Sequence, residues 1–326
     1  MFRLLSLSLL AGCGGVCPAG QVGGALGGCC DPGQTSVFGL CFGAPSDCPP
    51  GRALQDGQCE PVALPKIRFT RFPAGLARVG CDPIETSCDP DAADPVEIPI
   101  PHALEVMQTE VSQGLYAALM GTNPSRLHGC ADCPVEQVSW LDAARFANAL
   151  SGWARLPAVY ELHATDADAP PTVTQHLDRP GYRLPTDAEW EYVARMEPRP
   201  PLDTIAWHAN HGPGGTEPVG SLAPHPHGVY DLFGSVWEWT TSHPLDAVDS
   251  LSPEEAEGAR DPGLRVVRGG GWQSTRSELE AHYRGWVPAA YTDVTLGFRL
   301  VRTLPPTAAP PREDAEVGRQ PGIEAP

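Results

Sequence analysis

Apolar side chains recur at helical spacing in three segments of the chain, and each segment begins with a residue that caps helices. The predicted helices follow Ser112, Ser139 and Thr186. Thr186 also stands three residues before Glu189, which is the spacing of a capping box. The expected buried stripes are Leu115, Tyr116, Leu119 and Met120 in the first helix, Trp140, Ala143, Ala144, Ala147 and Leu150 in the second, and Trp190, Val193 and Ala194 in the third.

Short strand-like runs broken by glycine and proline replace the helical pattern after residue 200. Examples are residues 216–219, 229–232 and 265–268. The chain holds 35 Gly and 37 Pro, which favour turns and loops over a helix bundle. Helices followed by short strands predict one irregular α+β domain over residues 63–303.

The first thirteen residues have the pattern of an export signal, with one positive charge, an apolar run, and small residues before Cys13. The string Leu10-Ala11-Gly12-Cys13 resembles a bacterial lipoprotein cleavage box, which implies lipidation of Cys13. The alternative is an ordinary secreted protein in which Cys13 is structural. We expect an exported protein, either a periplasmic or outer-membrane lipoprotein or a secreted one, that contacts a membrane only through a lipid on Cys13.

All eleven cysteines lie within the first 133 residues. Residues 14–62 hold six of them among turn sequences and few apolar residues, so we expect a small module held by disulfides, with the pairing left open. Cys81 and Cys88 lie close in sequence, and Cys130 and Cys133 form a Cys-x-x-Cys. We expect this last pair to be a local disulfide rather than a redox or metal motif. The Pro-rich residues 304–326 are predicted to be disordered.

The net charge of −18 arises from 22 basic and 40 acidic side chains. An acidic surface repels phosphate backbones, so nucleic acid is not an expected partner. Such a surface also attracts divalent cations, but we interpret the charge first as a source of solubility.

Four sequence blocks in a fixed order carry a family resemblance. They occupy residues 110–126, 134–143, 181–192 and 228–239, and they include Arg-Leu-Pro-Thr-Asp-Ala-Glu-Trp-Glu at 183–191 and Gly-Ser-Val-Trp-Glu-Trp at 234–239. Arg-Gly-Gly-Gly-Trp at 268–272 and Leu-Gly-Phe-Arg-Leu at 296–300 follow them. Together they resemble the formylglycine-generating enzyme family, also called the sulfatase-modifying factor family, over about residues 66–303.

The resemblance implies a compact α+β fold, poor in regular secondary structure and related to C-type lectins. Several charged and aromatic residues of the blocks are expected to cap, pair and pack rather than to catalyse, because buried charges must be paired. These residues are Arg183, Glu189, Glu191, Trp237 and Trp239.

The resemblance also implies a calcium site in the block at residues 228–239. Carried over to this sequence, Asp231 and Glu238 supply carboxylate oxygens, and Gly234 and Val236 supply carbonyl oxygens, which are the ligand atoms that calcium prefers. The alternative is a turn that the same residues make rigid without a metal. A second calcium site of the family falls near residues 207–217, where the match is too loose to name ligands.

Enzymes that this chain resembles oxidise a substrate cysteine with molecular oxygen and bind copper(I) through two cysteines. Counting from Arg268 places these two positions at Leu279 and Arg284, and no cysteine follows Cys133. Copper is therefore not an expected cofactor, and we expect that copper-dependent formylglycine formation has been lost.

Glu280, His282 and Tyr283 occupy the region that the resemblance equates with the active site. A histidine beside a glutamate can transfer protons if a pocket shifts their pKa values. The alternative interpretation of this segment is an exposed, Glu-rich strand or turn.

Four histidines offer a rival metal site. Their spacing does not match a zinc-protease helix, and the surrounding Gly and Pro residues preclude a long helix. We interpret them as solvated loop residues. They are His208, His211, His225 and His227.

Two functions remain open. The first is a non-catalytic domain that binds a protein, peptide or glycan, because lectin-like loops and a disulfide-bonded acidic chain suit an extracellular binding protein. The second is a cofactor-light periplasmic enzyme of the same family that modifies a protein or a siderophore. A deep cleft joining Glu280, His282 and Tyr283 would favour the enzyme, and a filled groove would favour binding.

Overall fold

The computed structural model describes residues 48–55, 58–81, 95–163, 171–195, 200–246 and 263–305, and the backbone of four short strands before residue 43. These strands form two pairs, β1 (Val22–Gly23) with β2 (Cys29–Cys30) and β3 (Thr35–Val37) with β4 (Leu40–Phe42). The predicted export signal, most of the cysteine-rich module and the tail from residue 306 lie outside the described residues. Those three expectations stay predictions.

The three predicted helices form where the capping residues place them. They are α1 (Gln113–Met120), α2 (Trp140–Trp153) and α3 (Asp187–Ala194). The side chains of Ser112, Ser139 and Thr186 each accept a hydrogen bond from a backbone N–H of the first turn, and α2 and α3 have complete capping boxes. The one-turn elements α4 (Leu202–Ile205) and η2 (Arg276–Glu278) lie later in the chain.

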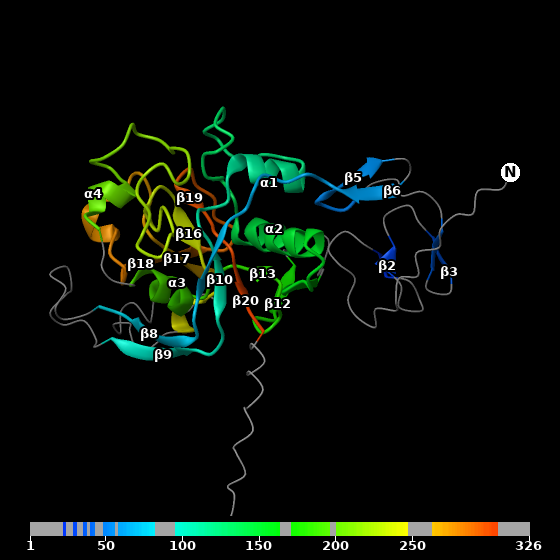
Figure 1. Cartoon of the computed structure of the whole chain (residues 1–326), viewed down its shortest axis with the longest axis horizontal. Helices are drawn as coiled ribbons and strands as arrows, with labels where there is room; N and C mark the ends of the chain where they lie inside the picture. Colours follow the sequence, from blue (N-terminus) through cyan, green and yellow to red (C-terminus); the bar gives the residue numbers. More distant parts are fainter. Residues whose placement is uncertain are drawn as a thin grey trace, which may run out of the picture.

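A four-stranded antiparallel sheet joins the start, middle and end of the domain. Its strand order is β13 (Tyr182–Arg183), β20 (Val301–Thr303), β10 (Leu104–Met107) and β7 (Phe69–Phe72). In Figure 1, β10 and β20 run side by side through the centre of the domain, between α2 on one side and α3 on the other. The last strand, β20, thus pairs with β10 from the early part of the domain and with β13 from its middle.

A second four-stranded sheet carries the predicted calcium block. Its order is β18 (Arg284–Pro288), β17 (Leu264–Arg268), β16 (Trp237–Trp239) and β19 (Leu296–Gly297), with β16 and β19 parallel. The strand predicted at residues 265–268 is therefore confirmed. Glu238 lies in the middle of this sheet, opposite Arg268 on one side and Gly297 on the other.

Short strand pairs complete the fold. They are β5 (Arg52–Gln55) with β6 (Gln58–Pro61), β8 (Gly75–Val79) with β9 (Val96–Ile100), β11 (Tyr160–His163) with β12 (Thr172–Gln175), and the parallel pair β14 (Ala206–Trp207) with β15 (Phe233–Gly234).

Two strand predictions were wrong, because residues 216–219 and 229–232 are loops. Hydrogen bonds to distant loops hold these segments instead of a ladder. The amide of Val219 donates to the Asp132 carbonyl at 2.9 Å, and the amide of Tyr230 donates to the Gln108 carbonyl at 2.6 Å. Pro218 has no N–H to contribute to a strand pair.

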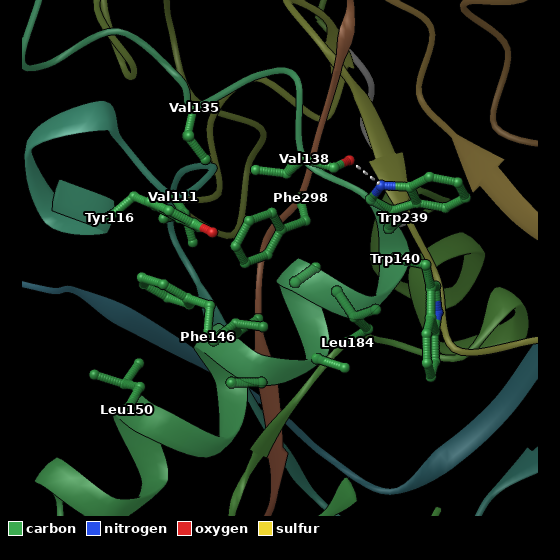
Figure 2. Packing of buried hydrophobic residues seen from close by; sticks show 14 of the residues in the cluster. Val111, Tyr116, Val135, Val138, Trp140, Phe146, Leu150, Leu184, Trp239 and Phe298 are labelled. Atoms are coloured by element: carbon green, nitrogen blue, oxygen red, sulfur yellow. Dashed lines mark hydrogen bonds between the residues drawn. The ribbon is translucent and has the colours of Figure 1, made fainter. Parts of the chain in front are cut away.

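The larger apolar cluster joins side chains of α1 and α2 to those of residues 296–300, and Figure 2 shows part of it. Phe146 stacks on Tyr116 with ring centres 5.2 Å apart and meets Phe298 edge-on at 5.3 Å. The indole N–H of Trp239 donates to the Val138 carbonyl at 2.9 Å, the bond dashed in Figure 2. A smaller cluster around α3, β8 and β9 takes up the third predicted stripe, Trp190, Val193 and Ala194.

The disulfide predicted between Cys130 and Cys133 is confirmed, with an S–S distance of 2.06 Å. Cys48 and Cys59 form a second disulfide, and Cys81 is also disulfide-bonded. No helix among the described residues is long and apolar enough to cross a lipid bilayer.

Candidate functional site

Three residues in the left-handed conformation bend the loop that carries the predicted calcium ligands. They are Asp231 (φ 55°), Gly234 (φ 77°) and Ser235 (φ 58°). The loop passes close to β14, where the Ser235 amide donates to the Trp207 carbonyl at 2.9 Å. A Cβ atom on Gly234 would lie 2.0 Å from that same carbonyl oxygen. Glycine is therefore required at this position by both conformation and space.

Asp231 shares a buried site with Glu110, a residue to which the sequence assigned no role. Asp231 is 5% exposed and Glu110 is 1% exposed. The Gly220 amide donates to Asp231 Oδ2 at 2.6 Å, whereas neither Glu110 oxygen meets a donor among the described residues. Burial, followed by the charge of Asp231, raises the pKa of Glu110 well above its usual value, and burial also raises the pKa of Asp231. Two facing acids of this kind fit either a shared proton or a cation.

Glu238 has a different set of partners. Both of its carboxylate oxygens accept from Arg299 Nε at 2.8 Å, and the indole N–H of Trp190 donates to Oε2 at 2.9 Å. Arg299 also donates to the Tyr230 carbonyl at 2.9 Å, which ties the ion pair to the loop before Asp231. Glu238 is thus neutralised by an arginine inside the protein.

The donor set fits calcium in part. In the described part of the chain, neither carboxylate oxygen of buried Glu110 has a hydrogen-bond partner, and Glu110 lies beside a cavity of about 270 Å³ that Asp132, Gly220 and Tyr230 also line. Asp231, the buried acid next to Glu110, adds a second carboxylate of the kind that calcium binds. Glu238 contributes oxygens that Arg299 already engages. The assignment of calcium to Asp231, Gly234, Val236 and Glu238 stays a prediction, and the structure adds Glu110 as a candidate ligand.

The predicted catalytic candidates lie on the turn between η2 and β18, and each is half-buried. The Tyr283 amide donates to the Glu280 carbonyl at 3.0 Å, and the Tyr283 ring lies 6.0 Å from the Trp237 ring. Burial, followed by the charge of Glu278, raises the pKa of Tyr283. Two cavities of about 270 and 560 Å³ in the described structure are lined by other residues, so neither unites Glu280, His282 and Tyr283.

The two positions equated with the copper cysteines are structural. Leu279 is fully buried in the smaller apolar cluster and packs close to Gly270. Arg284 forms an ion pair with Asp187, with Nη2 and Oδ2 2.8 Å apart. Neither side chain can act as a thiolate.

The other charged residues of the family blocks form ion pairs with one another inside the protein. Arg183 binds Glu189 through two parallel hydrogen bonds of 2.6 and 2.7 Å. Arg268 pairs with both Asp187 and Glu191. These contacts agree with the expected capping and pairing roles and leave these groups bound to one another.

The interpretation of the four histidines as solvated residues is wrong for two of them. His208 and His225 are each only 2% exposed, whereas His227 is exposed. His208 is buried because a backbone bridge folds residues 208–211 back on themselves and brings its ring against Asp203. The region expected to hold a second calcium site thus presents imidazole nitrogens, which calcium disfavours.

Comparison with known proteins places this geometry in a family. Residues 68–304 match the family described as "Sulfatase-modifying factor enzyme 1-like domain". The chain belongs to this sulfatase-modifying factor family, and its fold is the irregular, C-type-lectin-related α+β fold that the resemblance implied.

Relatives in the family carry diverse names. "Chaperone protein LppX" of Paenibacillus barcinonensis is 32% identical over 233 residues, covering 60% of this chain and 78% of the relative. "Formylglycine-generating enzyme" of Mycobacterium tuberculosis is 31% identical over 37% of this chain and 51% of its own length. "Inactive C-alpha-formylglycine-generating enzyme 2" of Bos taurus is 30% identical over 51% of this chain and 56% of its own length.

Solved structures agree on the fold. "Treponema denticola variable protein 1" is 25% identical, with a TM-score of 0.60, and the match covers 73% of this chain and 95% of that one. "Crystal Structure of CarF" describes a chain that is 26% identical, with a TM-score of 0.54, over 74% of this chain and 99% of that one.

Proposed function

We propose that this protein is exported and that its sulfatase-modifying factor domain is a non-catalytic binding domain. One observation carries the non-catalytic part of the proposal, namely that no cysteine follows Cys133. Export rests on the signal-like pattern of the first thirteen residues. Copper(I) chemistry in this family depends on two thiolates in the later half of the domain, and Leu279 and Arg284 are committed to packing and ion pairing. This chain keeps the fold of the family but lacks the two reactive thiolates, so we expect its surface to bind a partner without catalysing the oxidation.

The names of relatives support this proposal. One is called inactive and another is called a chaperone, so family members need not carry out the oxidation. The alternative, a periplasmic enzyme acting on a protein or siderophore through Glu280, His282 and Tyr283, needs a pocket at those residues. None of these three residues lines either of the two cavities described above.

A cavity of about 560 Å³ is a candidate binding surface for a protein, peptide or glycan. It lies between β9 and the start of α3, and its lining includes Ile98, Ile100, His102, Thr186 and Ser242. This volume is within the usual range for small-ligand sites, and the mixture of apolar and polar side chains suits a side chain or a sugar unit.

Cell fractionation followed by copper titration tests the proposal on the full chain. We expect the protein in the cell envelope or medium of an expressing bacterium, and we expect Cys13→Ser to move it out of the membrane fraction. The purified wild type should then not compete with a copper(I) chelator for the metal. A cytoplasmic location would refute export, and stoichiometric copper(I) binding would refute the loss of the copper site.

We further propose that the domain binds one structural calcium ion near Asp231 and Glu110. The support is the pair of neighbouring buried acids, of which Glu110 has no hydrogen-bond partner for either carboxylate oxygen among the described residues. Isothermal titration calorimetry of the metal-stripped protein should give calcium-binding heat in the wild type, none in Asp231→Ala and less in Glu110→Gln. The exposed Asp178→Ala serves as a control and should match the wild type. Identical heats in the wild type and Asp231→Ala would remove calcium from this site.

A further inference from the structure

Three side chains from neighbouring elements converge beside β14, away from the predicted calcium ligands. Asp203 lies on α4, and His208 and His211 follow β14. One ligand atom from each side chain lies within 4.8 Å of the corresponding atoms of the other two. Among the described residues, these three form the one group of histidine, cysteine, aspartate or glutamate side chains in which at least three ligand atoms lie this close together.

The backbone holds the two imidazoles in place. The His208 amide donates to the His211 carbonyl at 2.9 Å, and the His211 amide donates back to the His208 carbonyl at 2.8 Å. The ring centres are 5.8 Å apart, and Trp207 stacks on His211 at 5.0 Å. The side chain of His208 is fully buried. Main-chain hydrogen bonds and ring packing therefore fix the positions of the His208 and His211 rings before any ion binds.

Hydrogen bonds determine which ring nitrogen of each imidazole carries the hydrogen. His211 Nδ1 lies 3.1 Å from the Ala206 carbonyl oxygen, which can only accept, so Nδ1 carries the hydrogen and Nε2 keeps its lone pair. His208 Nε2 lies 2.9 Å from Asp203 Oδ1, and the Asn210 amide donates to His208 Nδ1 at 3.4 Å. In the metal-free protein Nε2 therefore carries the hydrogen, which must move to Nδ1 and break this long bond when an ion binds at Nε2. Two ligand atoms of a tetrahedral zinc ion stand about 3.3 Å apart, so a small rotation of the exposed Asp203 side chain admits an ion.

We propose that Asp203, His208 and His211 form a binding site for a divalent transition-metal ion of the zinc type. Two imidazoles and one carboxylate are ligands that zinc binds well, whereas calcium prefers oxygen alone. Three protein ligands leave at least one coordination position for water or for a group from a bound partner. The Asp203 side chain is 50% exposed, so solvent reaches this position.

Arg276 is the competitor for this ion. Its guanidinium forms an ion pair with Asp203 Oδ1, the same oxygen that faces His208. The Arg276 side chain is 53% exposed, so it can swing into solvent when an ion takes its place. A metal ion that binds here therefore replaces the Arg276 guanidinium at Asp203. Because this competition is lost when Arg276 is removed, the removal should strengthen metal binding.

A zinc titration of the full chain against a chromophoric chelator tests the proposal, with calcium present throughout. We expect one zinc equivalent in the wild type. His208→Ala, His211→Ala and Asp203→Asn should each weaken binding by at least about 10–100-fold, the loss that follows even from changes next to a ligand. Arg276→Gln should bind more tightly than the wild type. His227→Ala, an exposed histidine outside the group, should match the wild type.

His208→Ala removes a buried side chain and can disturb folding, so cobalt(II) absorption of the wild type and His211→Ala provides a second readout that does not use this variant. The wild type should show the visible bands of a nitrogen–oxygen site, and the partly exposed variant His211→Ala should lose them. If zinc binds equally in the wild type, His211→Ala and Asp203→Asn, or does not bind at all, the three residues form only an ion-paired cluster with Arg276 and the proposal is wrong.

Discussion

Gly234→Ala is expected to destabilise the protein by about 2–5 kcal/mol, the sum of left-handed strain and overpacking. Gly234 has φ 77°, and a Cβ there would lie 2.0 Å from the Trp207 carbonyl oxygen. That oxygen belongs to backbone that pairs β14 with β15, so it cannot move without breaking the pair. Urea unfolding followed by tryptophan fluorescence, with disulfides intact, measures the loss.

Gly121→Ala is the matched control. Gly121 ends α1 with the same φ of 77°, but no atom lies within 4 Å of a Cβ built there. The control therefore carries the conformational strain alone, about 1–2 kcal/mol. Equal losses in the two variants would mean that the close approach of β14 to the loop at residues 231–235 does not exist.

Arg299→Met is the second change with a large expected effect, a loss of about 3–5 kcal/mol. Arg299 and Glu238 are 1% and 0% exposed, and they are joined through hydrogen bonds of 2.6–2.8 Å. Removal of the guanidinium leaves Glu238 buried without its cation and also removes a positive charge that offsets Glu110 and Asp231. Urea unfolding at neutral pH measures this effect as well.

The double variant Arg299→Met/Glu238→Gln separates an unpaired charge from lost packing. Because the amide is neutral, the double variant should recover part of the stability that Arg299→Met loses. A loss below about 1 kcal/mol in Arg299→Met would contradict the account of Glu238 as an internally neutralised carboxylate.

Local sequence signals predicted the helices well. The caps at Ser112, Ser139 and Thr186 act on the amides of the next few residues, so they depend on little beyond their own segments. The family blocks likewise predicted the fold class. Residues 216–219 and 229–232 were misassigned as strands because short runs between glycine and proline look alike whether they pair in a ladder or bind single distant carbonyls.

The candidate sites depended on contacts that no local pattern encodes. Glu110 and Asp231 are far apart in sequence and meet only when the loop at 220–231 folds against the end of β10. The burial of His208 follows from its bridge to His211, which the glycines and prolines nearby did not reveal. Conversely, the absence of cysteine after Cys133 required no structure and did not depend on the alignment of Leu279 and Arg284.

The central claim is that this domain keeps the family fold without the family's thiol-based oxidation. The most direct test incubates the full chain with copper and a cysteine-containing sulfatase peptide under air, with an active formylglycine-generating enzyme as the positive control. Peptide mass, aldehyde labelling and oxygen consumption are the readouts. The account predicts unchanged peptide and no oxygen uptake above background, whereas catalytic turnover to the aldehyde would contradict it.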